Sequence, residues 1–153
     1  MPSGDIPVSE DPDEPLPFEY SITSYGTDFD VEGLIRRIER ADIYVPPFQR
    51  DFVWTLQQAS RFVESLLLGL PVPGVFLSRD EESRLLVIDG QQRLKSLLYF
   101  FQGIFRPSGR EFALSGLESR FSGSTYKSLD SEDKRRLNDS IIHATVLRQD
   151  HPD

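Results

Sequence analysis

The segment from Leu85 to Phe101 constrains the fold of this chain more than any other. It starts with four apolar residues in a row, passes through the polar sequence Asp-Gly-Gln-Gln-Arg at residues 89–93, and continues with apolar residues at helical spacing. Consecutive apolar residues are typical of a buried strand, and glycine permits a sharp change of direction. We therefore predict a strand over residues 85–88 that is buried on both faces, a tight turn, and a helix that ends near Gly103.

Helix and strand patterns also occupy most of the remaining chain after residue 30. Thr55 and Gln58 have the spacing of a helix capping box, and Gly69 with Pro71 indicates where that helix ends. The other patterns predict helices over residues 31–41, with Asp28 or Asp30 as N-cap, and over 131–138 after Asp130, and strands over 43–45, 75–77, 112–114 and 141–147. A charged stretch separates residues 75–77 from 85–88, which indicates an antiparallel pair. The chain is expected to form an α+β fold.

The first 30 residues carry the whole net charge of −8, because they contain eight acidic residues and no Lys or Arg. Such a segment, also rich in proline, has too few apolar residues to offset the entropy lost on ordering. We predict an acidic, flexible leader over residues 1–28 and one folded domain over residues 29–153. The leader could mimic nucleic acid or shield a basic cleft, and a solvated terminus is the simpler interpretation.

The composition excludes several kinds of chemistry. The chain has no Cys and only two His, which rules out disulfide frameworks, thiolate zinc sites and cysteine nucleophiles. No apolar run is long enough for a membrane helix, and the N-terminus lacks the pattern of a signal peptide, so we expect no membrane association and a cytoplasmic location. The overall acidity argues against a broadly basic DNA-binding face, although a local basic stripe stays open.

The turn at residues 89–93 has the residue types of an anion site. The first N–H groups of a helix lack intrahelical partners, and the helix dipole favours anions there. Gly90 permits close approach, Gln91 and Gln92 offer amides, and Arg93 offers a planar fork of donors suited to phosphate. Asp89 could hold a magnesium ion or orient a water molecule. In the alternative interpretation Asp89 only caps the helix and Arg93 only pairs with it.

A second polar element precedes the helix that starts after Thr55. Gln49 and Arg50 lie among aromatic residues on a loop stiffened by Pro46 and Pro47, which loses little entropy on binding. The aromatic residues Phe48, Phe52 and Trp54 could stack on a base, but aromatic residues more often pack in a core. For Trp54 we expect core packing.

Residues 45–54 and 88–94 together resemble the N-terminal domain of GmrSD-type, modification-dependent restriction enzymes. The resemblance spans about residues 30–150. In residues 45–54 it rests on a proline, an aromatic residue, Gln-Arg and a later Trp in that order, and in residues 89–93 on the DGQQR motif. It implies a ParB/sulfiredoxin-like α+β fold with a mixed sheet and packed helices. It also implies that the domain binds and hydrolyses an NTP (GTP, UTP or another) with Mg²⁺, and so controls attack on foreign DNA by an HNH-type nuclease domain or subunit.

The resemblance assigns roles to individual residues. It implies catalytic roles for Asp89, Gln92 and Arg93, with Asp89 also as the metal ligand. It implies nucleotide binding by Gln49, Arg50, Gly90, Gln91, Gln92 and Arg93. Lys95 departs from the family, which often has Thr-Thr at this point, and we expect its cation to contact phosphate or, in the alternative, to face solvent. The family's later paired-glycine segment does not appear before Asp153, so the domain is expected to be truncated at its C-terminal end. The chain has no HNH pattern either, so cleavage of DNA by that chemistry is expected from elsewhere.

Two alternative functions stay open at this point. In the first, the domain handles DNA directly, as a binding or nuclease module of ParB-like type that places Arg50, Arg93 and Lys95 on phosphates. In the second, it is a non-catalytic interaction module in which the Gln and Arg side chains only bridge loops. The absence of Cys excludes the redox chemistry of sulfiredoxin under every interpretation.

Overall fold

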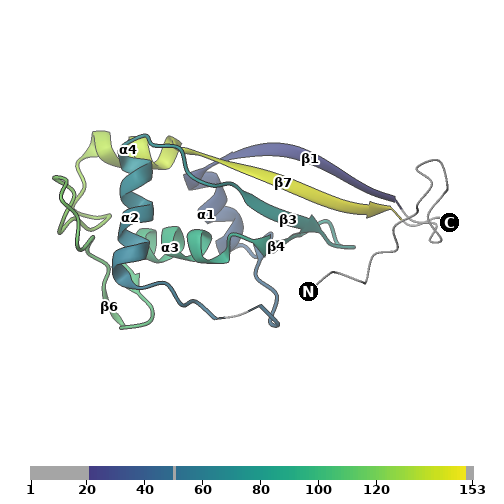
Figure 1. Cartoon of the computed structure of the whole chain (residues 1–153), viewed down its shortest axis with the longest axis horizontal. Coiled ribbons are helices and arrows are strands. Elements are labelled where there is room, and N and C mark those ends of the chain that lie inside the picture. The colour runs from purple at the N-terminus through teal and green to yellow at the C-terminus, as the bar shows by residue number, and fades with distance from the viewer. Residues whose placement is uncertain (1–20, 50, 151–153) are drawn as a thin grey trace, which may run out of the picture.

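The computed structural model describes residues 21–49 and 51–150, which form four helices and seven strands (Figure 1). In chain order these are β1 Ser21–Asp30, α1 Val31–Glu39, β2 Ile43–Tyr44, α2 Leu56–Leu67, β3 Val75–Arg79, β4 Leu85–Asp89, α3 Gln91–Gln102, β5 Ile104–Phe105, β6 Arg110–Glu111, α4 Ser131–Asp139 and β7 Ile141–Asp150. None of the helices in these residues has the length and hydropathy needed to cross a lipid bilayer.

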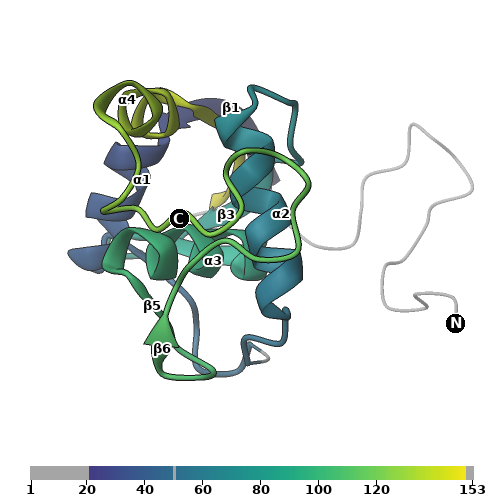
Figure 2. The same cartoon turned by 90° about the vertical axis from the view of Figure 1, so that its left-hand side faces the viewer.

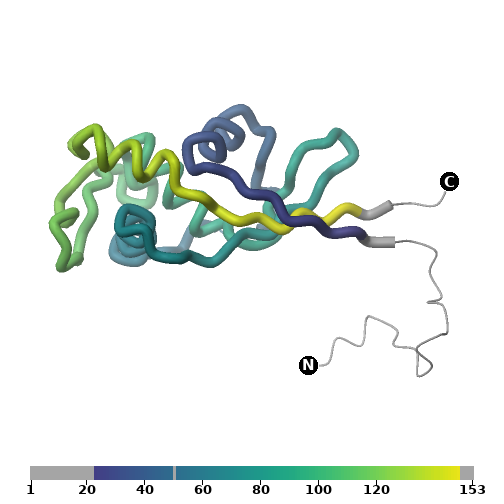
Figure 3. Tube along the Cα trace, turned by 90° about the horizontal axis from the view of Figure 1, so that it is seen from above, coloured from purple at the N-terminus to yellow at the C-terminus, as the bar shows by residue number. Residues whose placement is uncertain are grey.

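Five of the strands form one mixed sheet in the order β1-β7-β3-β4-β2, which confirms the predicted α+β fold. The pairs β1–β7 and β3–β4 are antiparallel, whereas β3–β7 and β2–β4 are parallel. β1 and β7 extend together beyond the helices as a long two-stranded arm (Figures 1 and 3). The short strands β5 and β6 pair separately as a hairpin below α3 in Figure 2.

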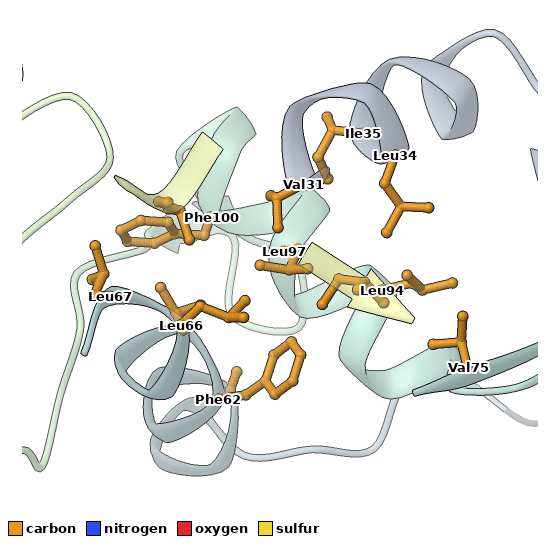
Figure 4. Close-up of a cluster of buried hydrophobic side chains, with 14 of the residues drawn as sticks. Val31, Leu34, Ile35, Phe62, Leu66, Leu67, Val75, Leu94, Leu97 and Phe100 are labelled. Carbon is orange, nitrogen blue, oxygen red and sulfur yellow. The ribbon is translucent and has the colours of Figure 1, made fainter. Parts of the chain in front are cut away.

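The hydrophobic core lies between the helices and one face of the sheet. Figure 4 shows side chains from α1, α2 and α3 meeting there, among them Leu34, Leu66 and Phe100. Alternate strand residues point the other way, so Phe76 is 47% exposed and Ile88 is 40% exposed. The prediction that residues 85–88 are buried on both faces is therefore wrong: Leu85 and Val87 are buried, whereas on the outer face Leu86 is half-buried and Ile88 is exposed.

The predicted helix starts are confirmed. Asp30 caps α1 by accepting from the Gly33 N–H, and Asp130 caps α4 in the same way. Thr55 and Gln58 make both hydrogen bonds of the predicted capping box at the start of α2. That helix ends at Leu67, before Gly69, which has a positive φ of 74°. These local signals fix where each helix begins because the side chain and the N–H that it caps are neighbours in sequence.

Two expectations need correction. Residues 112–114 are not a strand: β6 lies just before them, and Phe112 instead packs edge-on against Phe100 with ring centroids 5.3 Å apart. Residues 21–28, which composition assigned to the leader, pair with β7 along its length and belong to the sheet. Their polar residues gave no signal of a strand because the pairing partner is at the other end of the chain. Residues 1–20 of the predicted leader lie outside the described residues.

Candidate functional site

A polar cavity of about 290 Å³ lies where β4 turns into α3. Six residues singled out in the sequence line it, namely Gln49, Asp89, Gly90, Gln91, Gln92 and Arg93, together with Trp54 and Ile88. We call it the polar cavity. Gln49 and Trp54 come from the loop between β2 and α2, and the others come from the end of β4 and the start of α3. The fold thus brings together the two polar elements that the sequence separates.

Gly90 shapes this turn. It is the N-cap of α3 with a φ of 110°, a left-handed conformation that residues with a Cβ rarely adopt. The backbone also passes so close to β3 that an added Cβ would lie 2.9 Å from the Cβ of Val75. Glycine has no side chain with which to cap the helix, and no side-chain cap occurs there within the described residues. The alternative in which Asp89 caps α3 is therefore wrong, and the helix N-terminus faces the polar cavity without a capping carboxylate.

Arg93 is anchored by the backbone of a neighbouring segment. Its Nη2 donates to the Gly74 carbonyl at 2.7 Å and to Asp89 Oδ2 at 3.4 Å, and its side chain is 19% exposed. Its Nε is buried without a hydrogen-bond partner in the described part of the chain. The pairing with Asp89 that the sequence suggested is thus present, but Asp89 is 70% exposed and the bond to Gly74 is the shorter one. The guanidinium keeps donor capacity for a ligand.

The amide of Gln92 holds the loop before α2. Its Oε1 accepts from the backbone N–H groups of Val53 at 2.8 Å and Trp54 at 3.1 Å. Its Nε2 donates to the Asp51 carbonyl at 3.2 Å. Both ends of the amide are therefore used within the protein, as the interaction-module interpretation expected of the Gln side chains.

The other candidate residues are placed differently. Gln49 donates to the Val87 carbonyl at 3.4 Å, and Gln91 is 7% exposed. Arg50 lies outside the described residues. Lys95 lines a separate apolar cavity of about 290 Å³ between α1, β2 and α3, which we call the apolar cavity. The fold does not bring Lys95 to the polar cavity.

The aromatic residues of the loop divide between core and solvent. Trp54 packs edge-on against Phe62 with ring centroids 5.9 Å apart, which confirms its predicted core packing. Phe52 packs in the same way against Tyr99 at 5.1 Å. Phe48 is 81% exposed. Only Trp54 of these lines the polar cavity.

Sequence reasoning missed Gly74, whose carbonyl anchors Arg93. A Cβ at this position would lie 2.6 Å from the His143 carbonyl oxygen, so glycine is needed where β3 starts beside β7. The Pro73-Gly74 pair was the available signal, since this pair is typical of a turn. Nothing in the sequence connected that turn with residue 93.

The donor set of the polar cavity suits a metal ion that arrives with a ligand. Asp89 supplies one exposed carboxylate, and the described residues contain no group of three or more His, Cys, Asp or Glu side chains that could hold a metal. Magnesium is commonly bound by one or two carboxylates together with substrate phosphates and water. Asp89 therefore fits a magnesium ion shared with phosphate.

Comparisons with known proteins point to one family. Residues 31–151 match the family model described as the GmrSD restriction endonuclease, N-terminal domain. An uncharacterized protein of Methanocaldococcus jannaschii is 31% identical over 90 residues, which cover 43% of this chain and 16% of that protein. The matched part is thus a small fraction of that relative's length. No solved structure matches the chain with significance.

Proposed function

Because this chain belongs to the family of GmrSD restriction endonuclease N-terminal domains, we propose that it binds and hydrolyses a nucleoside triphosphate as the regulatory domain of a DNA restriction system. The phosphates would occupy the polar cavity at the start of α3. The observation that carries this proposal is the convergence of Gln49 and residues 89–93 on that one cavity.

The charges and donors at the polar cavity support an anionic ligand. Gly90 is the N-cap of α3 and has no side chain that could cap the helix, so the helix dipole acts on the cavity without a capping carboxylate. Arg93 lines the cavity, and its hydrogen bonds within the described residues use only Nη2. Its Nη1 donors are therefore left for a phosphate oxygen, which they would bind with charge-assisted hydrogen bonds.

Each remaining residue has a role in this proposal. Asp89 would hold the magnesium ion carried by the phosphates, and that ion supplies charge neutralisation for phosphoryl transfer. Gln92 would act through the loop that it holds, by fixing Trp54 and the segment after Gln49 at the wall of the cavity. Lys95 has no role at the phosphates, because it lines the apolar cavity.

The proposal extends to the complete protein. Foreign DNA would be its target, and an HNH-type nuclease domain or subunit would make the cut. The mixed sheet with helices on one face agrees with a ParB/sulfiredoxin-like relationship, which we include in the proposal. Which of GTP, UTP or another triphosphate is the natural ligand is the first question for experiment.

The test is calorimetric titration of the chain with ATP, GTP, CTP and UTP in the presence of Mg²⁺. We expect one of them to bind and Arg93→Gln to weaken it by about 1.5–3 kcal/mol, the contribution of a hydrogen bond to a charged group, or about 10- to 150-fold in Kd. Lys95→Gln is the matched control, since it removes a cation from the same helix but from a different cavity. Binding that is lost equally in both variants, or absent with all four nucleotides, would refute the proposal.

A non-catalytic interaction module is the second candidate function, and the bonds of Gln92 favour it. All three of its hydrogen bonds go to the loop at residues 51–54. In that case Gln92→Ala and Arg93→Gln would lower the melting temperature and leave any nucleotide response unchanged.

A further inference from the structure

A cavity of about 410 Å³ lies on the helix-covered side of the sheet and is lined by residues of β1, β7, α1 and the β3–β4 turn. Its polar and aromatic lining includes Tyr25, Thr27, Phe29, Arg37, Arg79 and Ser83. It shares no lining residue with the polar cavity. We call it the arginine cavity.

The strand β1 supplies one wall. Tyr25, Thr27 and Phe29 alternate along β1 and therefore point to the same face, the face that Val146 of β7 also occupies. Leu85 and Val146 form a buried apolar floor. The cavity thus combines an apolar floor with polar groups at its sides, as small-molecule sites do.

Two guanidinium groups line this cavity, and only neutral groups hold them in place. Arg79 donates from Nη2 to the Tyr25 hydroxyl at 2.6 Å and from Nη1 to the Ser83 carbonyl at 3.2 Å. Arg37 donates from Nη1 to the Gly33 carbonyl at 3.3 Å and lies 5.1 Å from the centre of the Phe29 ring. Among residues 21–49 and 51–150, no carboxylate lies within ion-pair distance of either guanidinium.

The one acid in the lining is already paired. Asp42 also lines the arginine cavity, but its Oδ2 lies 2.9 Å from Arg40 Nη2. Two partly buried positive charges therefore face a cavity whose only carboxylate is neutralised by a third arginine. A dianion would offset the two remaining charges.

The β3–β4 turn keeps Arg79 in this position. Ser83 has a positive φ of 66°, which is uncommon for a residue with a Cβ. Asp80 Oδ1 stabilises the turn by accepting from the N–H groups of Glu82 at 2.9 Å and Arg84 at 2.8 Å. The Ser83 carbonyl is thereby fixed where it orients the Arg79 fork, so little entropy would be lost when an anion binds.

We propose that the arginine cavity binds the phosphomonoester group of a small molecule. Such a group carries a charge of about −1.5 to −2 at neutral pH and three acceptor oxygens. Arg37 and Arg79 match that charge, and each uses only part of its five N–H donors within the protein. The hydroxyls of Tyr25 and Thr27, which have no acceptor within the described residues, supply further donors. A cavity of about 410 Å³ admits a ligand larger than phosphate alone.

The test is amide chemical-shift mapping of the whole chain during titration with inorganic phosphate, AMP and glucose 6-phosphate. We expect saturable shifts at Tyr25, Thr27 and Ser83 rather than at residues 89–93, and the three probes identify whether phosphate alone, a base or a sugar is recognised. Because the mapping uses the unaltered chain, it does not depend on how a variant folds. Shifts confined to residues 89–93 would overturn this proposal and leave that of the polar cavity standing.

Affinity measurements on variants complete the test. Arg37→Gln and Arg79→Gln should each raise the Kd for the phosphomonoester by about tenfold or more. Arg36→Gln is the matched control, because Arg36 is on the same helix, pairs with Glu32 and does not line the cavity. An equal loss of affinity in the control would indicate that the phosphomonoester is attracted by the overall positive charge of the surface, and it would overturn the proposal. So would saturation by a short DNA duplex with no response to the monoesters.

Discussion

The substitution Gly90→Ala tests the geometry of the β4–α3 turn most directly. Alanine must adopt the φ of 110° seen at this position, and a residue with a Cβ in the left-handed region costs about 1–2 kcal/mol. In addition, the new methyl group would lie 2.9 Å from the Cβ of Val75, a β-branched residue that is only 1% exposed and has no room to move. Overpacking of this kind costs about 1–3 kcal/mol. The expected total is about 2–5 kcal/mol, the sum of these two contributions.

A second glycine provides the matched control. Gly103 caps the other end of the same helix with a φ of 88°, and a Cβ there would meet no atom within 4 Å. Gly103→Ala should therefore show only the backbone contribution of about 1–2 kcal/mol. Any additional loss in Gly90→Ala measures how closely β3 approaches the turn.

Urea unfolding of the two variants and the original chain measures these free energies, provided that the dependence of the unfolding free energy on urea concentration has the same slope in all three. Adding Val75→Ala to Gly90→Ala should recover part of the loss, with a coupling of about 1 kcal/mol, as expected for residues in contact. If Gly90→Ala is no less stable than Gly103→Ala, the close approach is wrong. The account of why glycine begins α3 would then fail.

Three further outcomes follow from the described contacts. Gln92→Ala should destabilise the fold by about 1–3 kcal/mol, since it removes three hydrogen bonds to the loop before α2. Gln102→Ala on the same helix is the control and should change the free energy of unfolding little. Equal losses in the two variants would show that Gln92 does not hold this loop. Thr55→Ala should cost about 1 kcal/mol in urea unfolding through loss of the α2 cap, and no change would contradict the capping box. Hydrogen bonds from Arg120 at 2.9 Å hold the pKa of Asp133 below its usual value, against the burial that raises it. Because that pKa is lower in the folded state, the ionised carboxylate stabilises the fold above the unfolded pKa of about 3.9, and this stabilisation is lost as pH falls through the folded value. The difference in unfolding free energy between the original chain and Asp133→Asn should therefore shrink in acid. A difference that stays constant with pH would refute the assignment.

Local signals explain what could be predicted about the fold. The N-caps Thr55 and Asp130 were identified, and Asp30 was one of two candidates, because a cap and the N–H it satisfies lie within three residues of one another. The strand, turn and helix around Gly90 followed from periodicity and from the one residue type that tolerates the turn. The strand β1 escaped prediction since its polar residues are ordered by pairing with β7, which lies more than a hundred residues later.

The same distinction applies to the candidate site. The sequence indicated Gln49 and residues 89–93 as chemistry-bearing, and the fold places them around one cavity. It gave no indication that the Gly74 carbonyl would orient Arg93, and it could not say that the loop bridged by Gln92 would be the one at residues 51–54. Those contacts depend on which strand lies next to β4, and strand order is not a local property of the chain.

Neighbouring residues are thus enough to establish where helices begin, where the chain must turn, and which residues carry charge and hydrogen-bonding capacity. Tertiary structure alone decided that Lys95 faces the apolar cavity and that Arg37 and Arg79, from α1 and β3, line one cavity without a carboxylate partner. The difference arises from the distance along the chain over which each interaction acts. Capping and periodicity act over a few residues, whereas the charge balance of a cavity is set by packing between segments that the chain brings together only when the sheet has formed.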